Sequence, residues 1–70
     1  MQQWEYREMF ADFRKVVQVN HQPTKKPEPT ILDYLNQAGR EGWEVIAVTS
    51  FGAGGEYKTY ILKRPLTTEG

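Results

Sequence analysis

The residues that could take part in acid–base chemistry are few and scattered along the chain. His21 is the only histidine, the residue type that titrates near neutrality, and Asp12 and Glu28 are its candidate carboxylate partners. A general base also needs an orienting partner and a substrate pocket. Because His21 lies in a proline-rich segment, we interpret it as a solvated loop residue.

The carboxylates and the hydroxyl groups give no stronger indication of catalysis. Three glutamates could form an acid pair or a metal site near a helix–strand junction: Glu5, Glu41 and Glu44. Nothing in their spacing brings them to one face, and surface ion pairs with Arg7 or Arg40 are the commoner arrangement. The chain has no cysteine, and its one serine, Ser50, has no sequence signature of activation. We therefore predict no enzymatic activity, no catalytic residue, no cofactor and no metal.

The glycines at 52, 54 and 55 could suggest a phosphate-binding loop, because glycine allows backbone N–H groups to approach an anion. Such a loop leads from a strand into a helix and is followed by a lysine and a serine or threonine. Here the glycines precede Tyr57, Lys58 and Thr59, which read as a strand. A hairpin loop is the favoured interpretation.

Basic side chains occur in pairs that could contact phosphates. The candidates are Arg14, Lys15, Lys25, Lys26, Lys63 and Arg64. With Tyr57 and Tyr60 on a predicted sheet, they allow a single-stranded nucleic-acid binder in which bases stack on the rings. However, nine Lys and Arg balance nine Asp and Glu, and a pI of about 6.6 is far from the basic footprint of such domains. Nucleic acid is therefore an unfavoured partner.

The N-terminal part of the chain predicts a strand over 4–11, with Trp4, Tyr6 and Phe10 on one side and Met9 on the other. Residues 13–19 are rich in β-branched side chains and either extend this strand past a bulge or return as a short hairpin arm. Residues 20–29 contain three prolines and predict an extended surface connection.

The segment from Thr30 to Val48 predicts a helix followed by a strand. Thr30 can cap the helix, which ends at Glu41, and Gly42 is placed to take a left-handed conformation. Trp43 should then pack back near Ala38. We expect Gly39 to make room for a neighbouring side chain, plausibly Trp43 or Trp4.

Strands are predicted over 43–51 and 57–64, and Pro65 should end the sheet. The fold class is therefore α+β: a small three-stranded mixed sheet in strand–helix–strand–strand order, with a possible extra hairpin arm and one helix on one face. If the last strand lies between the other two, it is antiparallel to both. One domain spans 1–70, with a frayed tail at 66–70.

Both faces of the predicted sheet are apolar, and one helix covers only one of them. We expect the other face to be an exposed patch that marks an interface. The candidate interface residues are Met9, Phe13, Val17, Val19, Ile46, Val48, Tyr60 and Leu62. This pattern predicts a homodimer or larger ring, formed sheet to sheet or through an edge strand.

Chain length supports the same expectation. A chain of 70 residues buries about 60% of the surface that its unfolded form exposes, so its core is marginal. Without cysteine and with one histidine it lacks the ligands for disulfides or a structural metal, which leaves oligomerisation. The absence of cysteine and of an apolar segment near twenty residues favours a cytoplasmic domain with no membrane contact.

Several short motifs resemble the small bacterial and phage family catalogued as domain of unknown function 4177. They are Trp4-Glu5-Tyr6, Leu35-Asn36 with Gly39, Glu41-Gly42-Trp43-Glu44-Val45 and Tyr60-Ile61-Leu62-Lys63-Arg64-Pro65. The resemblance spans nearly the whole chain and implies a small α+β domain, with no known activity. The chain departs from the family in its long segment 13–29, where a specialised function could lie.

The function predicted from these features is a non-enzymatic interaction or regulatory domain that self-associates and binds a protein partner. Two alternatives stay open. One is a small-ligand or nucleotide binder with its site at a subunit interface, and the other is the nucleic-acid binder that uses the basic pairs.

Overall fold

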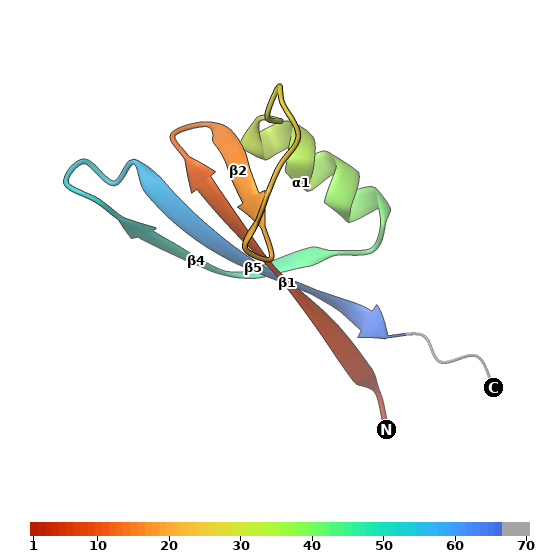
Figure 1. The fold of residues 1–70 in the computed structure, drawn as a ribbon. Helices are drawn as coiled ribbons and strands as arrows, with labels where there is room; N and C mark the ends of the chain where they lie inside the picture. Colours follow the sequence, from red (N-terminus) through yellow and green to blue (C-terminus); the bar gives the residue numbers. More distant parts are fainter. Residues whose placement is uncertain (67–70) are drawn as a thin grey trace.

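The computed structural model describes residues 1–66, which form one sheet and one helix (Figure 1). The elements in chain order are β1 (Gln3–Asp12), β2 (Lys15–Val19), β3 (Gln22–Pro23), α1 (Ile31–Arg40), β4 (Glu44–Phe51) and β5 (Tyr57–Leu66). The strand order across the sheet is β3-β2-β1-β5-β4, and every neighbouring pair is antiparallel.

The predicted three-stranded mixed sheet is therefore wrong, since the sheet has five strands and only antiparallel neighbours. The difference arises after β1, where residues 15–19 return beside β1 as β2 and residues 22–23 add β3. The turn between β2 and β3 is made by Asn20 and His21, both with positive φ, as favoured hairpin turns require. The last strand, β5, does lie between β1 and β4.

The segment between β3 and α1 folds back along β2 and is more than a solvated connection. The N–H of Val16 donates to the carbonyl of Pro29 at 2.8 Å, and the N–H of Thr24 donates to the carbonyl of Val17 at 3.1 Å. The hydroxyl of Thr24 donates to the carbonyl of Val16 at 2.7 Å. This side of β2 is consequently covered by its own chain.

Helix α1 has the two ends that the sequence predicts. The hydroxyl of Thr30 accepts from the N–H of Asp33 at 3.1 Å, and Glu41 is the C-cap. Gly42 has φ 91°, the left-handed region that glycine enters without a Cβ penalty. The N–H of Trp43 then donates to the carbonyl of Ala38 at 3.0 Å, which turns the chain back toward the sheet.

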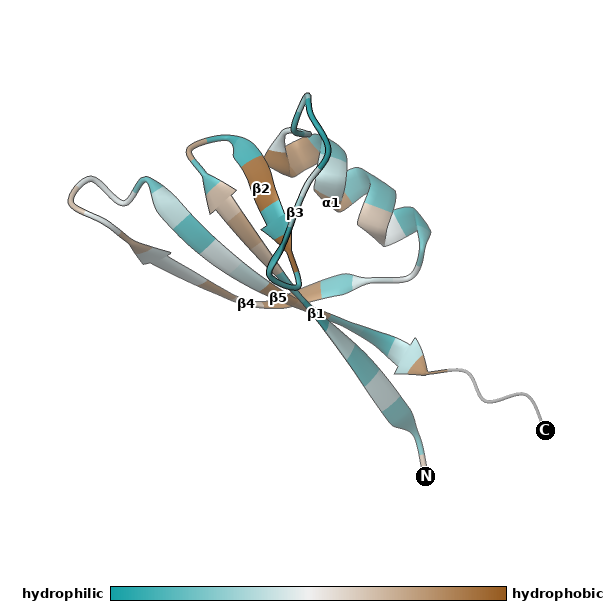
Figure 2. Ribbon diagram, in the orientation of Figure 1, coloured by the Kyte–Doolittle hydropathy of each residue, from teal (hydrophilic) through white to brown (hydrophobic). Residues whose placement is uncertain are grey.

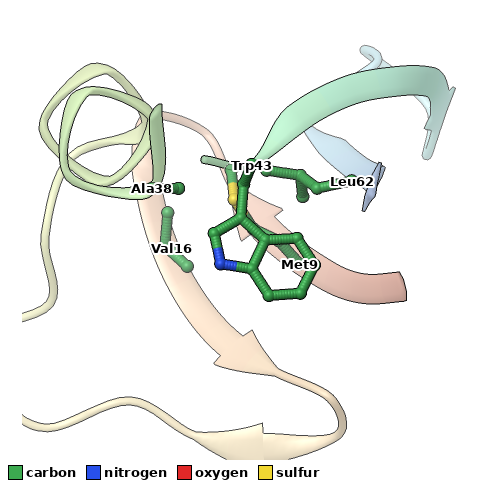
Figure 3. Packing of buried hydrophobic residues seen from close by; sticks show 5 residues of the cluster. All are labelled: Met9, Val16, Ala38, Trp43 and Leu62. Carbon is green, nitrogen blue, oxygen red and sulfur yellow. The ribbon is translucent and has the colours of Figure 1, made fainter. Parts of the chain in front are cut away.

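The core lies between α1 and the β2, β1 and β5 part of the sheet. Five buried side chains form it: Met9, Val16, Ala38, Trp43 and Leu62. Trp43 is in its centre, with Ala38 and Val16 on one side of the indole and Leu62 on the other (Figure 3). Hydrophobic segments of α1 and β2 lie next to each other in Figure 2. Trp43 thus packs near Ala38, as predicted.

The prediction of which sheet face is uncovered is wrong. Met9 is 0% exposed and Leu62 is 1% exposed, so neither lies on an uncovered patch. Val19 and Tyr60 are half-buried and pack against the same core. The face that carries Trp4, Tyr6 and Phe10 is the one opposite α1, and we call it the open face.

A β-bulge in β4 explains why alternation along that strand misleads. Val45 pairs with Leu62 and Ala47 pairs with Ile61, which leaves Ile46 as the extra residue. A bulge shifts the two-residue period by one position. Val48 therefore lies on the same face as Val45, whereas strict alternation would put them on opposite faces.

Two expectations about β5 and the chain end also need correction. Pro65 does not end the sheet, because it pairs with Trp4 inside β5, which continues to Leu66. The pairing of β4 with β5 begins at Glu44 opposite Lys63. Among residues 1–66, therefore, no strand lies beside Pro65 on the β4 side of β5, and the missing N–H of Pro65 interrupts no strand pairing on that side. Of the predicted frayed tail, residues 67–70 lie outside the described residues.

In the described part of the chain, α1 is too short and too polar to cross a membrane.

Gly39 does not make room for a neighbour, contrary to prediction. It is exposed, and a Cβ built there would meet nothing within 4 Å. The Gly39→Ala substitution should therefore raise the free energy of unfolding by up to about 1 kcal/mol, because alanine loses less backbone entropy in a helix. Urea denaturation measures the change, and a loss of stability would mean that the glycine has a packing role.

Candidate interaction edge and open face

Strand β4 forms one edge of the sheet and is exposed along all eight residues. Figure 1 shows the β4–β5 hairpin reaching away from α1. After Glu44 the strand contains no charged residue and no proline, and Figure 2 shows no strongly hydrophilic position beyond its start. Val48 is 50% exposed and Phe51 is 46% exposed. A long, uncharged, exposed edge is a template for pairing with another strand.

The other edges of the sheet carry features that oppose such pairing. Strand β3 has two residues, of which Pro23 lacks a backbone donor. Within the described chain, residues 3–7 of β1 pair with β5 and with no other strand, but that stretch carries Glu5 and Arg7. Charges, proline and short length are the usual protections of edge strands. Within residues 1–66, β4 is the long edge that has none of them beyond its first residue.

The open face next to β4 carries a group of neighbouring rings that we call the aromatic cluster: Phe10, Phe51 and Tyr57. Their ring centroids are 5.6 to 5.8 Å apart, within the range of favourable aromatic pairs. The cluster joins the central strand β1 to the edge strand β4 through β5. It extends the apolar surface of the edge onto the open face.

The β4–β5 loop positions this cluster. Gly52 has φ 98°, and a Cβ there would lie 2.9 Å from Cδ2 of Tyr57, so glycine allows the ring to pack closely. The N–H of Gly54 donates to Oε1 of Glu56 at 2.8 Å. Hydrogen bonds from the backbone N–H groups of Glu56 and Gly54 hold the pKa of the Glu56 carboxyl below its usual value. This is the predicted hairpin loop.

Phe13 lies at the same end of the sheet, in the turn between β1 and β2. Its ring is 69% exposed, and its backbone has φ 55°. A bulky residue in this region is rare, and the conformation costs about 1 to 2 kcal/mol. Its N–H donates to the carbonyl of Glu56 at 2.7 Å, which ties this turn to the β4–β5 loop. Strain of this kind often accompanies functional surfaces.

The Phe13→Gly substitution should raise the free energy of unfolding by about 1 kcal/mol, because glycine adopts positive φ without the Cβ clash. Chemical denaturation measures this effect. Phe13→Ala is the matched control, since it removes the ring but keeps the Cβ and the strain. An equal gain in both variants would attribute the effect to the exposed ring and contradict the backbone explanation.

The predicted interface residues divide into three groups. Phe13, Ile46 and Val48 are exposed, with Ile46 at the bulge of β4. Val17, Val19 and Tyr60 are half-buried, and Met9 and Leu62 are in the core. The prediction missed Ala47, Thr49, Phe51 and the rest of the aromatic cluster. The matching positions of Phe51 and Tyr57 on either side of the glycine loop were the available sequence signal for that pair.

The six basic candidates do not come together on one surface. Lys26 Nζ lies 3.2 Å from Oε2 of Glu28, and its hydrogen bond lowers the pKa of that carboxyl. Lys63 stacks on Trp4 with Nζ 4.1 Å from the ring centroid. Arg64 donates to Oε2 of Glu5 at 2.8 Å. Arg14 lies in the β1–β2 turn, Lys15 begins β2, and Lys25 lies in the segment that covers β2.

His21 pairs with Glu8, and neither predicted carboxylate is its partner. Nε2 of His21 lies 2.7 Å from Oε1 of Glu8, and the histidine side chain is 80% exposed. The pair lies beside Phe10, Gln18 and Thr59 in a shallow depression. Glu8 lies next to the β2–β3 turn only because β2 pairs with β1. The position of Glu8 in the sequence therefore did not indicate that it would pair with His21. The three glutamates Glu5, Glu41 and Glu44 form no metal-binding group with other His, Asp or Glu within residues 1–66.

Comparisons with known protein families, with curated proteins and with solved structures found no match for this chain. The resemblance to domain of unknown function 4177 therefore stays a prediction. We consequently infer a function from the exposed edge of β4 and the aromatic cluster beside it.

Proposed function

We propose that this chain is a non-enzymatic interaction domain that self-associates through the edge of β4 and binds a protein partner. The single observation that carries the proposal is an edge strand that is exposed at all eight residues and has no charge after Glu44. Strand addition satisfies the backbone groups of such an edge. The open face, with its aromatic cluster, is the surface that we assign to the protein partner.

The small size of the core supports self-association. Five buried side chains form the core cluster, and α1 covers only the side of the sheet near β2. Val45 and Val48 share a face with the core residue Leu62 and the half-buried Tyr60, yet they are 39% and 50% exposed. A second chain placed against β4 would bury apolar area that this chain leaves in water, and each Å² buried contributes about 25 cal/mol.

The size of the β4 edge determines how strong we expect self-association to be. An interface that buries less than about 1,200 Å² in total is typical of weak association. One strand with its flanking side chains belongs to this class, so we expect a dissociation constant in the micromolar range, about −7 to −8 kcal/mol.

Sedimentation equilibrium over protein concentrations from about 1 μM to about 1 mM tests the proposal. We expect the mass to rise with concentration from 8.1 kDa toward twice that value, 16.2 kDa. A mass of 8.1 kDa throughout would refute self-association.

A further inference from the structure

We propose that the partner of β4 is the β4 strand of a second copy, paired antiparallel about a two-fold axis that passes beside Thr49. This inference rests on the proposed self-association and adds the register of the pairing. In this register Thr49 faces its own copy, Val48 faces Ser50, and Ala47 faces Phe51. The two sheets would then form one continuous ten-stranded sheet.

The face that each side chain occupies restricts the possible registers. Ala47, Thr49 and Phe51 pair with Ile61, Thr59 and Tyr57 on the open face. Val48 and Ser50 pair with Tyr60 and Lys58 on the face of α1. Directly opposed residues in an antiparallel pair lie on the same side of a sheet. A two-fold axis perpendicular to the sheet must therefore match open-face residues with open-face residues.

The bulge at Ile46 limits the regular part of the edge to residues 47–51. Centring the axis at Thr49 pairs all five of these residues, each with a residue of the same face. Centring it at Val48 would place Phe51 opposite Val45, which the bulge has moved to the other face. Centring it at Ser50 would place Val48 opposite Gly52, beyond the end of β4.

The side chains in the Thr49 register are complementary in size. Phe51, the largest, lies opposite Ala47, the smallest, on the open face. Ala47 neighbours Ile61 across the β4–β5 pair, so the ring of Phe51 would continue the aromatic cluster of one copy onto Ala47 and Ile61 of the other. Val48 lies opposite the small Ser50 on the face of α1.

Charge also permits this pairing and disfavours the other edges. Residues 45–51 contain no ionisable side chain, so no like charges meet across the two-fold axis. The free part of β1 carries Glu5 and Arg7, and charged side chains on an edge strand oppose strand addition. A second copy of β4 is thus the occupant that matches β4 in charge, length and side-chain size.

Single-cysteine crosslinking tests the register, since the natural chain has no cysteine. Opposed Cα atoms in an antiparallel pair lie about 4.5 to 5.5 Å apart, within the range that a disulfide bridges. Under mild oxidation Thr49→Cys should form a covalent dimer that dithiothreitol reverses. Val48→Cys and Ser50→Cys should each crosslink poorly alone, but a mixture of the two should yield the mixed disulfide.

Sedimentation of each reduced variant distinguishes a failure of the proposed register from a failure of the proposed self-association. Efficient self-crosslinking of Val48→Cys or Ser50→Cys, with Thr49→Cys inert and the reduced proteins still dimeric, would overturn the register and leave self-association standing. Dimeric protein with no crosslink at any of the three positions would overturn β4 as the contact. Monomeric reduced variants, together with a monomeric natural chain, would overturn both proposals.

Discussion

The Val48→Lys variant is expected to lose self-association, with a dissociation constant raised at least about 100-fold, or about 2.7 kcal/mol. Val48 lies in the middle of the exposed edge and is 50% exposed, so its replacement leaves the core intact. In the proposed dimer a lysine here brings an ammonium group from each copy to the seam between the two β4 strands, on the face of α1. Inward charges on an edge strand are a common natural barrier to strand addition.

Leu32→Lys is the matched control for this variant. Leu32 is 68% exposed on α1, and its replacement removes an exposed aliphatic side chain and adds the same charge away from β4. Sedimentation should show that Leu32→Lys associates as the natural chain does, while circular dichroism should show both variants folded. Equal weakening by the two substitutions would indicate a general effect of hydrophobicity or charge and would contradict a contact at β4.

The Trp43→Ala variant is expected to lose about 3 to 5 kcal/mol of stability, the usual effect of removing a large buried ring. Trp43 is 6% exposed and contacts side chains from α1 and three strands at the centre of the core. The guanidinium carbons of Arg7 and Arg64 lie 4.4 and 4.5 Å from the ring centroid. Because a domain of this size has a small margin of stability, we expect the variant to be largely unfolded.

Two further substitutions sharpen this prediction. Trp4→Ala makes the same chemical change at a ring that is 39% exposed on the open face, and it should cost far less. Trp43→Phe keeps much of the packing and removes an indole N–H that is buried without a hydrogen-bond partner within the described chain, so its cost should be intermediate. Urea denaturation measures all three. Equal losses for Trp4→Ala and Trp43→Ala would contradict the central position of Trp43.

Local signals in the sequence predicted the helix and the two last strands well. Thr30 and Gly42 mark the helix ends through hydrogen bonds to residues within a few positions, and the glycines at 52, 54 and 55 mark a hairpin that closes on itself. These features depend on near neighbours, which the sequence displays directly. The same reasoning placed Trp43 against Ala38.

Non-local pairing explains what the sequence left open or missed. The β-branched residues 13–19 allowed either an extension of the first strand or a short hairpin arm, and the arm forms because residues 15–19 pair with β1 as β2. The two-residue β3, which pairs with β2, has no strong local pattern. The bulge at Ile46 moves Val48 to the other face, and nothing in the chemistry of residues 43–51 indicates its position. The uncovered face was therefore assigned to the wrong residues, since Met9 and Leu62 lie in the core.

The sequence predicted part of the candidate site. Val48 and Ile46 were predicted as interface residues and lie exposed on β4. The aromatic cluster was missed because Phe10, Phe51 and Tyr57 come from three strands, and their stacking depends on the β1–β5–β4 order. Aromatic side chains on a strand read as core in a sequence, whereas here they lie on the face away from α1.

Amide hydrogen exchange as a function of protein concentration reports which strand edge gains hydrogen bonds on association, and it therefore tests directly whether the chain self-associates through β4. We expect alternate amides of residues 47–51 to exchange more slowly as concentration rises, while the amides of residues 3–7 and of Gln22 in β3 stay unchanged. Concentration-dependent protection confined to β1 or β3, or an associated protein whose β4 amides exchange at a constant rate, would contradict it.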